Sequence, residues 1–430
     1  MGSRSDIFDR SGFSPHAGLG PAGASHLHRD GARVLIYSHD TFGLGHMRRS
    51  RAIANALAGE RDGVLVVILS GSPVIGSFEF GSGVDHVRLP GVTKLPDGDY
   101  RSLHLNVSID EAVGLREAII RQTAETFAPD LFIVDKEPTG FRGEIAAALE
   151  HLQTRGCRCV LGVRDVLDEP SLLVPEWERK GAADALSRYY DEIWIYGLRD
   201  IYEPLAALEL PAEAEVRITY TGYLRRDLPQ TSPITRYPKL TRSPFVLVTT
   251  GGGGDGDDLI DWVISAYEAQ PAFLPALIVF GPFINRDRRS GFLERINRHP
   301  KLDAIAFDSK IEFLMQKAAA VVAMGGYNTF CEILSLDKPA LIVPRTRPRL
   351  EQYIRAVEAE RRGLVRMLCE DGSGRDPAHM VAALSALPDQ PRPSEIVVPG
   401  LLDGLDVIRT RFTAGLAAPL TMPALRQAAG

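Results

Sequence analysis

One histidine in the N-terminal half is placed where it could act as a general base. His46 follows the apolar run Arg33–Ser38, which has the composition of a buried strand, and it precedes a segment with helical spacing. It is therefore expected at a helix N-terminus and at the carboxyl end of a strand, where open α/β sheets bind ligands. The helix dipole disfavours the imidazolium form there, so His46 would accept a proton near neutral pH. The alternative is a histidine that only caps the helix or packs between domains.

A carboxylate ends another strand of the same predicted sheet. Asp135 closes the apolar run Leu131–Asp135, and parallel strands bring their carboxyl ends to one edge of a sheet. Asp135 is therefore the second candidate catalytic residue, either contacting an acceptor or orienting His46, unless it only caps the following helix. The same edge should carry acceptor-side loops, for which the candidates are Gly43, Gly45, Arg49, Arg164 and Asp165.

The C-terminal half holds a glycine turn of the kind that binds phosphate. Gly325 and Gly326 follow a short apolar run, and Asn328 or Thr329 can cap the helix that should come next. Free backbone N–H groups and the helix dipole would both point at an anion there. Glu332, one turn into the helix, is placed to accept hydrogen bonds from a ribose diol. The plainer interpretation is a β-α-β packing unit whose glycines only allow close contact with the helix.

A second glycine-rich turn precedes the first along the chain. An apolar strand leads into four glycines and then into the predicted helix Leu259–Ala269, which makes another phosphate cradle. Asp255, Asp257 and Asp258 place negative charge beside this turn, so we expect their side chains to turn away and cap the helix. A metal site at these aspartates is the weaker interpretation. The candidate donor-binding glycines of this turn are Gly251, Gly252, Gly253 and Gly254.

Six positions in the C-terminal half carry a resemblance to a known family. Their order and spacing resemble the GG-x-x-T-x-x-E…P-x…VP…Q signature of the glycosyltransferase family 28 C-terminal domain. The resemblance implies the α/β GT-B fold, in which two Rossmann-like domains with parallel sheets face each other across a cleft. It also implies a UDP-linked sugar as donor, with the uracil near Ile311. The matching positions are Gly325-Gly326, Thr329, Glu332, Pro339, Pro344 and Gln352.

Two positions depart from the pattern of that family. Its members read the hydroxyl groups of the donor sugar with a pair of glutamines, of which Gln352 matches the second. The first is replaced here by Glu351, and Arg355 stands where an asparagine is usual. The identity of the donor sugar is therefore left open.

The loop around His46 has resemblances of its own. GLGHMRR, residues Gly43–Arg49, is similar to the GGH-like loop of lipid-linked transferases. It is similar also to the G-x-GH-x-x-R loop of the UDP-sugar hydrolase of pseudaminic acid synthesis. Both resemblances place His46 over the anomeric carbon, where it would deprotonate an acceptor hydroxyl in a transferase or a water molecule in a hydrolase. Either Arg48 or Arg49 could meet the diphosphate if it faces the cleft, and the alternative for each is an exposed, solvated position.

Composition excludes several classes of protein. The chain has 430 residues, 45% of them hydrophobic and 24% charged, with a formal net charge of −6, which is typical of a globular protein and not of a nucleic-acid binder. Its four cysteines lack metal-site spacing and are expected to be reduced. No run of roughly 18 apolar residues predicts a membrane span. We expect a cytoplasmic protein, with peripheral contact at the inner face of the membrane left open for the apolar cluster around Trp177.

The chain length and its loop-rich segments predict two domains. Residues 1–30 are expected to form a disordered tail, because they lack a periodic apolar face. The remaining predicted parts are an N-terminal acceptor-binding domain at 31–223, a linker at 224–243, a C-terminal nucleotide-sugar-binding domain at 244–400 and a crossover helix at 401–416.

These patterns together predict a hexosyltransferase-type GT-B enzyme. It would move a sugar from a nucleotide-sugar donor to a glycan or lipid-linked acceptor, with inversion, in cell-envelope or exopolysaccharide synthesis. The resemblance implies that it needs no metal and no cofactor beyond its substrate. Two alternatives stay open at this point, namely a UDP-sugar hydrolase and a nucleotide-sugar-binding protein without catalytic activity.

Overall fold

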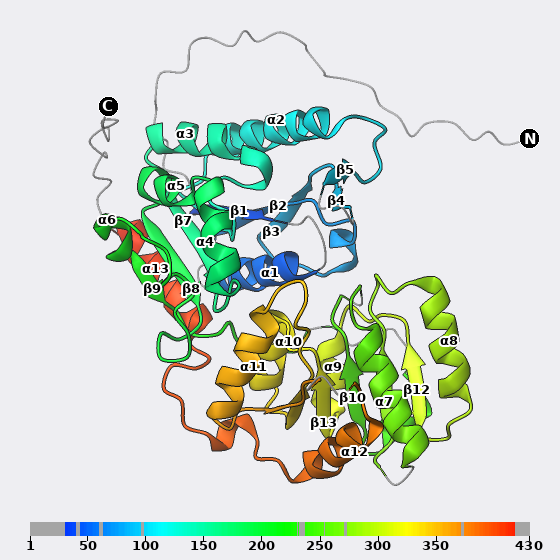
Figure 1. The fold of residues 1–430 in the computed structure, drawn as a ribbon. Coiled ribbons are helices and arrows are strands. Elements are labelled where there is room, and N and C mark those ends of the chain that lie inside the picture. The colour runs from blue at the N-terminus through cyan, green and yellow to red at the C-terminus, as the bar shows by residue number, and fades with distance from the viewer. Residues whose placement is uncertain are drawn as a thin grey trace, which may run out of the picture.

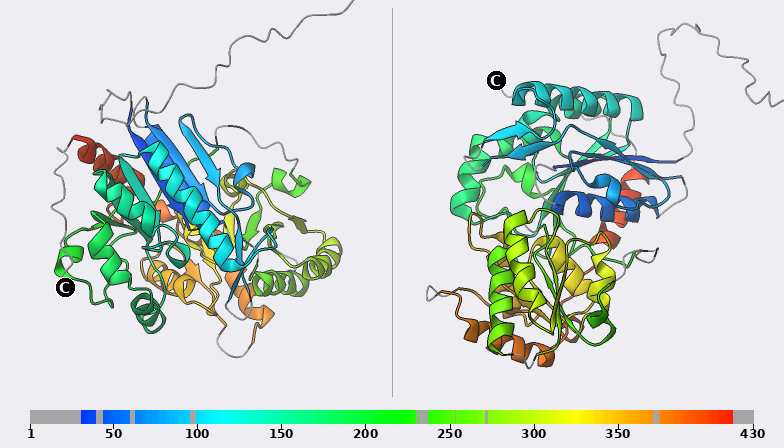
Figure 2. Two further views of the ribbon diagram at one scale, coloured as in Figure 1. Left: turned by 90° about the horizontal axis from the view of Figure 1, so that it is seen from above. Right: turned by 90° about the vertical axis from the view of Figure 1, so that its right-hand side faces the viewer.

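The computed structural model describes residues 31–39, 44–59, 63–95, 99–229, 231, 237–252, 254–270, 273–370 and 374–417 (Figure 1). The predicted tail at 1–30, Gly43 and Gly253 lie outside the described residues. The chain forms two α/β units, each with its own parallel sheet, which confirms the predicted fold class. The right-hand view of Figure 2 shows the two units stacked on one another.

The first sheet has seven parallel strands in the order β3-β2-β1-β6-β7-β8-β9. Its central strands are apolar throughout, as expected for a sheet covered on both faces. The strand order reverses between β1 and β6, so the ends of these two strands leave a crevice. The strands are β1 (Arg33–Ser38), β2 (Leu65–Ser70), β3 (Val84–Arg88), β6 (Leu131–Asp135), β7 (Arg158–Arg164), β8 (Glu192–Tyr196) and β9 (Ile218–Tyr220).

Helices cover both faces of this sheet. In Figure 1, α2 and α3 lie on the outer face, and α1 and α13 lie together on the face toward the second unit. Ile53 and Leu57 of α1 pack into one core, and Ile120 of α2 packs into the other. The helices are α1 (Gly45–Ala58), α2 (Ile109–Phe127), α3 (Ala146–Thr154), α4 (Pro170–Arg179), α5 (Ala182–Tyr189) and α6 (Ala212–Glu215).

The second sheet has six parallel strands in the order β12-β11-β10-β13-β14-β15. This order repeats the 3-2-1-4-5-6 pattern of the first sheet, and its reversal lies between β10 and β13. The strands are β10 (Val246–Thr249), β11 (Ala276–Val279), β12 (Leu302–Ile305), β13 (Ala320–Ala323), β14 (Ala340–Ile342) and β15 (Arg366–Met367).

The second sheet is also covered on both faces. Trp262 of α7 and Met380 of α12 are buried against one face, and Phe330 of α10 is buried on the other. The helices are α7 (Asp257–Ala269), α8 (Arg286–Asn297), α9 (Ile311–Lys317), α10 (Tyr327–Ser335), α11 (Glu351–Arg361), α12 (Pro377–Ala386) and α13 (Gly404–Ala417).

The last helix returns to the first sheet. α13 packs on α1, where the Arg409 guanidinium donates a hydrogen bond to the Ala56 carbonyl oxygen at 3.2 Å. Leu224 pairs as a bridge with Asp403, so the chain leaves and re-enters the N-terminal unit at the same place. Figure 2 shows α13, in red, against the N-terminal unit. The crossing agrees in position with the helix expected at 401–416.

Charged side chains join the two units across their interface. Arg355 of α11 donates to both carboxylate oxygens of Asp165, at 2.6 and 2.7 Å. Both residues are fully buried, so losing either one would leave an uncompensated buried charge at a cost of about 3–5 kcal/mol. Arg349 makes a second link by contacting Asp168 at 3.1 Å and Glu176 at 2.8 Å. The relative placement of the two units is therefore set by buried ion pairs as well as by apolar contact.

Residues 84–108 contain β3, which is part of the first sheet, and the antiparallel pair β4 (Val92–Lys94) and β5 (Tyr100–Ser102). In the apolar cluster around Trp177, Trp177 and Leu173 of α4 are buried in the core, whereas Leu172 is 44% exposed. Contact of this cluster with a membrane stays a prediction. None of the helices in the described part of the chain is long and apolar enough to cross a bilayer.

The structure corrects the expectation that the aspartates beside the second glycine turn cap the helix. Gly256 is the N-cap of α7, and no side chain caps it. Asp257 and Asp258 instead lie in the first turn of the helix, where their charge is favourable to the helix dipole. Each of these two aspartates also pairs with an arginine, Asp257 with Arg288 and Asp258 with Arg375.

Candidate functional site

A cavity of about 240 Å³ lies between the two units. Its walls come from the start of α1 and the end of β7 on one side, and from the end of β10 and the segment that follows β13 on the other. The two crevices left by the reversals of strand order therefore open onto the same space, because the carboxyl edges of both sheets face the interface. Of the predicted residues of the N-terminal unit, Gly45, His46, Arg49 and Arg164 line the cavity, whereas Asp135 and Asp165 are not among the lining residues.

His46 is held by the carboxylate that the sequence placed at the end of β6. Its Nδ1 donates a hydrogen bond to Asp135 Oδ2 at 2.5 Å, which leaves Nε2 free to accept a proton. Arg49, one turn further along α1, donates to Asp135 Oδ1 from Nε at 2.9 Å and from Nη2 at 2.7 Å. Asp135 is 3% exposed, and its carboxylate is thus fixed by two partners from one helix. This is the arrangement of a base, an orienting carboxylate and a group that fixes the carboxylate.

The electrostatics of this group favour a neutral imidazole. Burial lowers the pKa of His46 below its ordinary value, and the attraction of Asp135 does not fully restore it. Burial alone would raise the pKa of Asp135, but Arg49 and then His46 outweigh it and bring that pKa down to about 2. Near neutral pH the pair therefore consists of an ionised carboxylate and a neutral histidine, which is the protonation state required of a general base.

The C-terminal unit lines the same cavity with backbone. Gly325, two residues after the end of β13, has a φ of 78°, a left-handed conformation, and a Cβ there would lie 2.6 Å from Ile342 Cγ2. Gly326 is the N-cap of α10, so the free N–H groups of the first turn of this helix point toward the cavity. Gly251 has a φ of 71° in the other turn. The cavity is lined here by Gly251, Gly252, Gly254, Gly325, Gly326 and Thr329.

Comparison with known proteins agrees with this geometry. Residues 246–389 match the family model described as the glycosyltransferase family 28 C-terminal domain. We call the C-terminal unit, which contains this match, the family 28 domain. No curated protein matches the chain significantly.

Solved structures extend the likeness to the whole chain. The calicheamicin glycosyltransferase CalG4 shares 16% identity and a TM-score of 0.55 over 90% of this chain and 100% of its own. MurG from Acinetobacter baumannii shares 12% identity and a TM-score of 0.53 over 88% and 99%. The UDP-GlcNAc 2-epimerase from Neisseria meningitidis, solved with UDP-GlcNAc, shares 13% identity and a TM-score of 0.55 over 89% and 100%. Likeness at these identities shows that the chain has the GT-B fold.

Glu332 of the family 28 domain lines the cavity but is already engaged. Its Oε1 lies 2.5 Å from Nη2 of Arg48, which belongs to the N-terminal unit and also contacts Glu312 at 2.8 Å. Burial and then the charge of Glu312 raise the pKa of Glu332 to about 7, because Arg48 compensates two carboxylates at once. For Glu332 to accept ribose hydroxyls, Arg48 must give up this contact.

The other predicted donor residues of the family 28 domain also line the cavity. Ile311 begins α9 and Gln352 lies in the first turn of α11, where its Oε1 accepts a hydrogen bond from the Arg345 backbone N–H at 3.1 Å. Asn328 is used differently. Its Nδ2 donates to the Gly45 carbonyl oxygen at 2.9 Å and its Oδ1 accepts from Arg226, so it ties α10 to α1.

One acceptor-side expectation needs correction. Asp165 is 1% exposed and is not among the residues that line the cavity, and both of its oxygens accept from Arg355. Arg49 lines the cavity with its Nε and Nη2 donating to Asp135, and its contact with a diphosphate stays a prediction. Gly45, the first residue of α1, lies in the cavity wall as expected.

Arg345 and Glu351 line the cavity but were not among the predicted site residues. Arg345 contacts Glu351 at 2.5 Å and also Asp255. Glu351 is 3% exposed, and its Oε2 is buried without a hydrogen-bond partner among the described residues. Both follow β14, so the rule that ligands meet strand ends could have found them. Within the described ranges no group of three or more His, Cys, Asp or Glu side chains is arranged to hold a metal ion.

Proposed function

We propose that this protein is a glycosyltransferase that moves a sugar from a UDP-linked donor to an acceptor hydroxyl group. One observation carries the proposal: an oriented, neutral histidine and two glycine turns face each other across a single cavity. The family 28 domain would bind the nucleotide sugar, and the N-terminal unit would bind the acceptor. A cytoplasmic location and a role in cell-envelope or exopolysaccharide synthesis are part of the proposal.

The reaction follows from the geometry of the pair. His46 Nε2 would take the proton of the acceptor hydroxyl while the acceptor oxygen attacks the anomeric carbon of the donor. The bond from that carbon to the diphosphate oxygen would break on the opposite side, which inverts the configuration. The proton ends on the imidazole, where Asp135 stabilises the resulting positive charge, and the electron pair leaves with UDP.

The charge that develops on the diphosphate would be held mainly by backbone. The N–H groups at the N-terminus of α10 and in the turn at Gly251 and Gly252 are preorganised donors, so they need no rearrangement when charge develops. Arg345 is the nearest candidate for a side-chain cation, since it lines the cavity and comes from the same domain. This supports a donor site that relies on dipoles and arginine without a bound metal.

The test combines binding with turnover. Thermal shift with a panel of nucleotides and nucleotide sugars should show stabilisation by UDP and by UDP-sugars, since ligands stabilise only the state that they bind. His46→Ala should reduce turnover by a factor on the order of 10²–10⁴ and leave UDP affinity within about twofold. Activity that survives His46→Ala would remove the role given to His46.

The same assay separates the alternatives. Prompt release of UDP from a UDP-sugar without any acceptor would indicate a hydrolase. Conversion of the sugar without release of UDP would indicate an isomerase, a reaction class represented among the solved structures of this fold. Binding of UDP without turnover under any condition would indicate a nucleotide-sugar-binding protein.

A further inference from the structure

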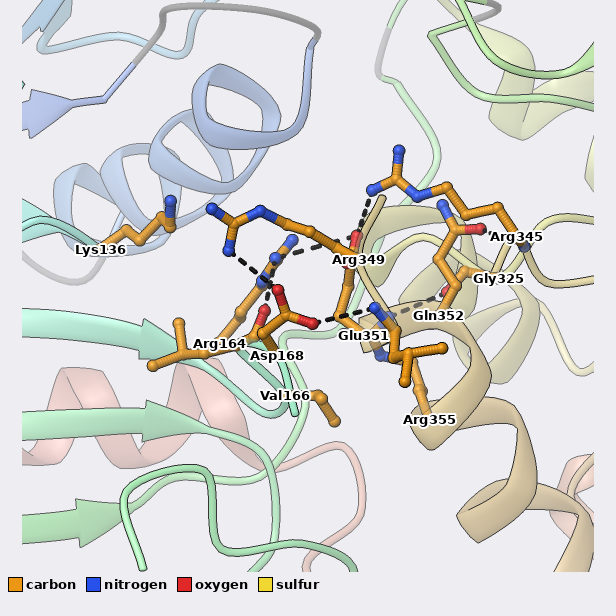
Figure 3. A network of polar contacts seen from close by, with 12 residues as sticks. Lys136, Arg164, Val166, Asp168, Gly325, Arg345, Arg349, Glu351, Gln352 and Arg355 are labelled. Atoms are coloured by element: carbon orange, nitrogen blue, oxygen red, sulfur yellow. Dashed lines mark hydrogen bonds and ion pairs between the residues drawn. The ribbon is translucent and has the colours of Figure 1, made fainter. Parts of the chain in front are cut away.

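Three basic side chains from separate segments lie close together beside the proposed catalytic pair. Lys136 directly follows β6, Arg164 ends β7, and Arg349 belongs to the loop between β14 and α11 (Figure 3). We call these three residues the basic cluster. Burial lowers the pKa of Lys136, and the charges of Arg164 and Arg349 lower it further. The cluster is thus close enough for its members to repel one another.

Arg164 is incompletely compensated. Its Nε is buried without a hydrogen-bond partner among the described residues. Its ion pair with Glu351 is long, at 3.9 Å, and Arg345 contacts the same carboxylate oxygen at 2.5 Å. Burial lowers the pKa of Arg164 to about 10, more than Glu351 restores. A guanidinium with spare donors therefore stands in the wall of the cavity.

Lys136 is held in an unusual backbone conformation. Its φ is 72°, in the left-handed region that a lysine seldom adopts and that costs on the order of 1 kcal/mol. Strain of this kind collects at functional sites, because it persists only where the surroundings require it. The Lys136 ammonium is 2.9 Å from Glu137, but Glu137 also pairs with Lys180 at 2.8 Å. One carboxylate therefore serves two lysines.

The other carboxylates around the cluster are shared in the same way. Glu176 contacts both Arg349 and Lys180, at 2.8 and 2.6 Å. Asp168 accepts from Arg349 at 3.1 Å and also from the backbone N–H of Leu350 at 2.9 Å. In Figure 3, dashed lines join Arg349 to Asp168 and Arg345 to Glu351, the carboxylate that Arg164 also contacts. Each member of the cluster thus has a carboxylate partner, and Arg164, with its long ion pair and unpartnered Nε, is the least compensated of the three.

We propose that the basic cluster binds an anionic group, a carboxylate or a phosphate, carried by the acceptor. This inference rests on the proposed transfer reaction and specifies the class of its acceptor. Lys136 directly follows Asp135, the partner of His46, and Arg164 lines the same cavity as His46, so the proposal places the anion of the acceptor on the side of the cavity that holds the imidazole. Lys136 and Arg164 both belong to the N-terminal unit, which favours the acceptor over the donor as the source of the anion.

The experiment measures binding of inorganic phosphate to the full-length protein by calorimetry, at constant ionic strength and with saturating UDP. UDP fills the diphosphate site, so phosphate must bind elsewhere. Lys136→Asn and Arg164→Gln should each weaken phosphate binding about tenfold, which is typical of one lost charge-assisted hydrogen bond. Asparagine adopts the left-handed conformation readily, so Lys136→Asn should fold. Lys180→Gln is the matched control, because it removes a lysine paired with the same Glu137 but should change phosphate affinity less than twofold.

Glucuronate and glucose then extend the test to the acceptor. Glucuronate should bind in the presence of UDP, glucose should not, and the difference should vanish in Lys136→Asn. Failure of phosphate and glucuronate to bind while UDP binds would overturn the inference and leave the proposed function standing. Failure of UDP itself to bind would overturn the proposed function.

A second comparison identifies the source of the anion. UDP-glucose and UDP-glucuronate should bind with similar affinity, and Lys136→Asn should affect neither. A preference for UDP-glucuronate that Lys136→Asn abolishes would place the anion on the donor sugar and overturn the assignment to the acceptor.

Discussion

The two units line the cavity with different kinds of chemical group. The N-terminal unit presents side chains, in which His46, Asp135 and Arg49 are locked together by short polar contacts. The family 28 domain presents backbone, in the turns at Gly251 and Gly325 and at the start of α10. The difference matches the two tasks, because proton transfer needs a titratable group and binding of a diphosphate needs several fixed N–H donors. Substitution of a side chain in the N-terminal unit should therefore reduce turnover, and substitution of a glycine in the family 28 domain should reduce UDP affinity.

A buried carboxylate on each side shows the same contrast. Asp135 faces Arg49 without a competing acid, and its pKa falls to about 2. Glu332 shares Arg48 with Glu312 and is more deeply buried, and its pKa rises to about 7. Asp135 is thus a fixed charge, whereas the charge of Glu332 depends on pH and on what occupies the cavity.

The largest effect is expected at the side-chain half of the site. Asp135→Asn keeps the shape of the side chain but loses the charge that fixes His46 and stabilises its protonated form. We expect kcat to fall by a factor on the order of 10²–10⁴, with UDP affinity nearly unchanged. Steady-state kinetics and UDP titration measure the two quantities.

Loss of stability has to be separated from this effect. Glu144→Gln is the control, since Glu144 is equally buried and accepts two hydrogen bonds from Arg116 at 2.6 Å in the same unit. It should lower the melting temperature as Asp135→Asn does but leave kcat within a few-fold. Equal loss of kcat in both variants would mean that Asp135 acts only through stability.

The glycine turns of the family 28 domain should bind UDP less tightly when a methyl group is added to one of them. Gly325→Ala would place a Cβ 2.6 Å from Ile342 Cγ2 in a left-handed conformation, so the turn must shift. We expect UDP affinity to fall at least about tenfold. Gly291→Ala is the control in the same domain, because a Cβ there meets nothing within 4 Å and Gly291 lies in α8, outside the cavity lining. UDP titration of both variants checks the contrast, and equal affinities would remove the turn from the donor site.

The pH dependence of turnover is the third prediction. A base with a lowered pKa stays neutral to lower pH than an ordinary histidine does. The rate should therefore fall only below about pH 6.5, and it should then fall by at most about tenfold for each further pH unit. The profile of kcat/KM between pH 5 and 8 measures this, and a midpoint above 6.5 would contradict the proposed environment of His46.

The smallest effect concerns stability. The folded-state pKa of Glu332 is raised to about 7, so its contribution to stability is present at low pH and is lost as pH rises from about 4.5 through 7. Glu332→Gln does not titrate. Relative to this variant, the free energy of unfolding of the wild type should fall by on the order of 1 kcal/mol between pH 5 and 7 and then level off. Parallel curves in denaturant titrations would show that Glu332 is ionised throughout.

The sequence allowed much of the fold to be predicted for a simple reason. Buried parallel strands need unbroken apolar runs, and both β1 and β6 were located from those runs alone. The edge strands were harder, since β3 carries Asp85, His86 and Arg88 and lacks an apolar run, and it became visible only as a partner of β2. The capping role expected for Asp257 and Asp258 failed because arginines from other elements, which local sequence does not reveal, pair with them.

Local chemistry by itself determined which residues could act. A histidine at the start of a helix, an acid at the end of a strand and glycines after a strand are defined by neighbours within a few positions, so the sequence was enough to find His46, Asp135 and Gly325. Tertiary structure alone decided which side chains contact one another across the interface. Arg48 reaches Glu332 and Arg355 reaches Asp165 across the interface, from positions nearly 200 residues or more apart. Such pairs depend on how two independently formed sheets pack, and no spacing along the chain encodes that geometry.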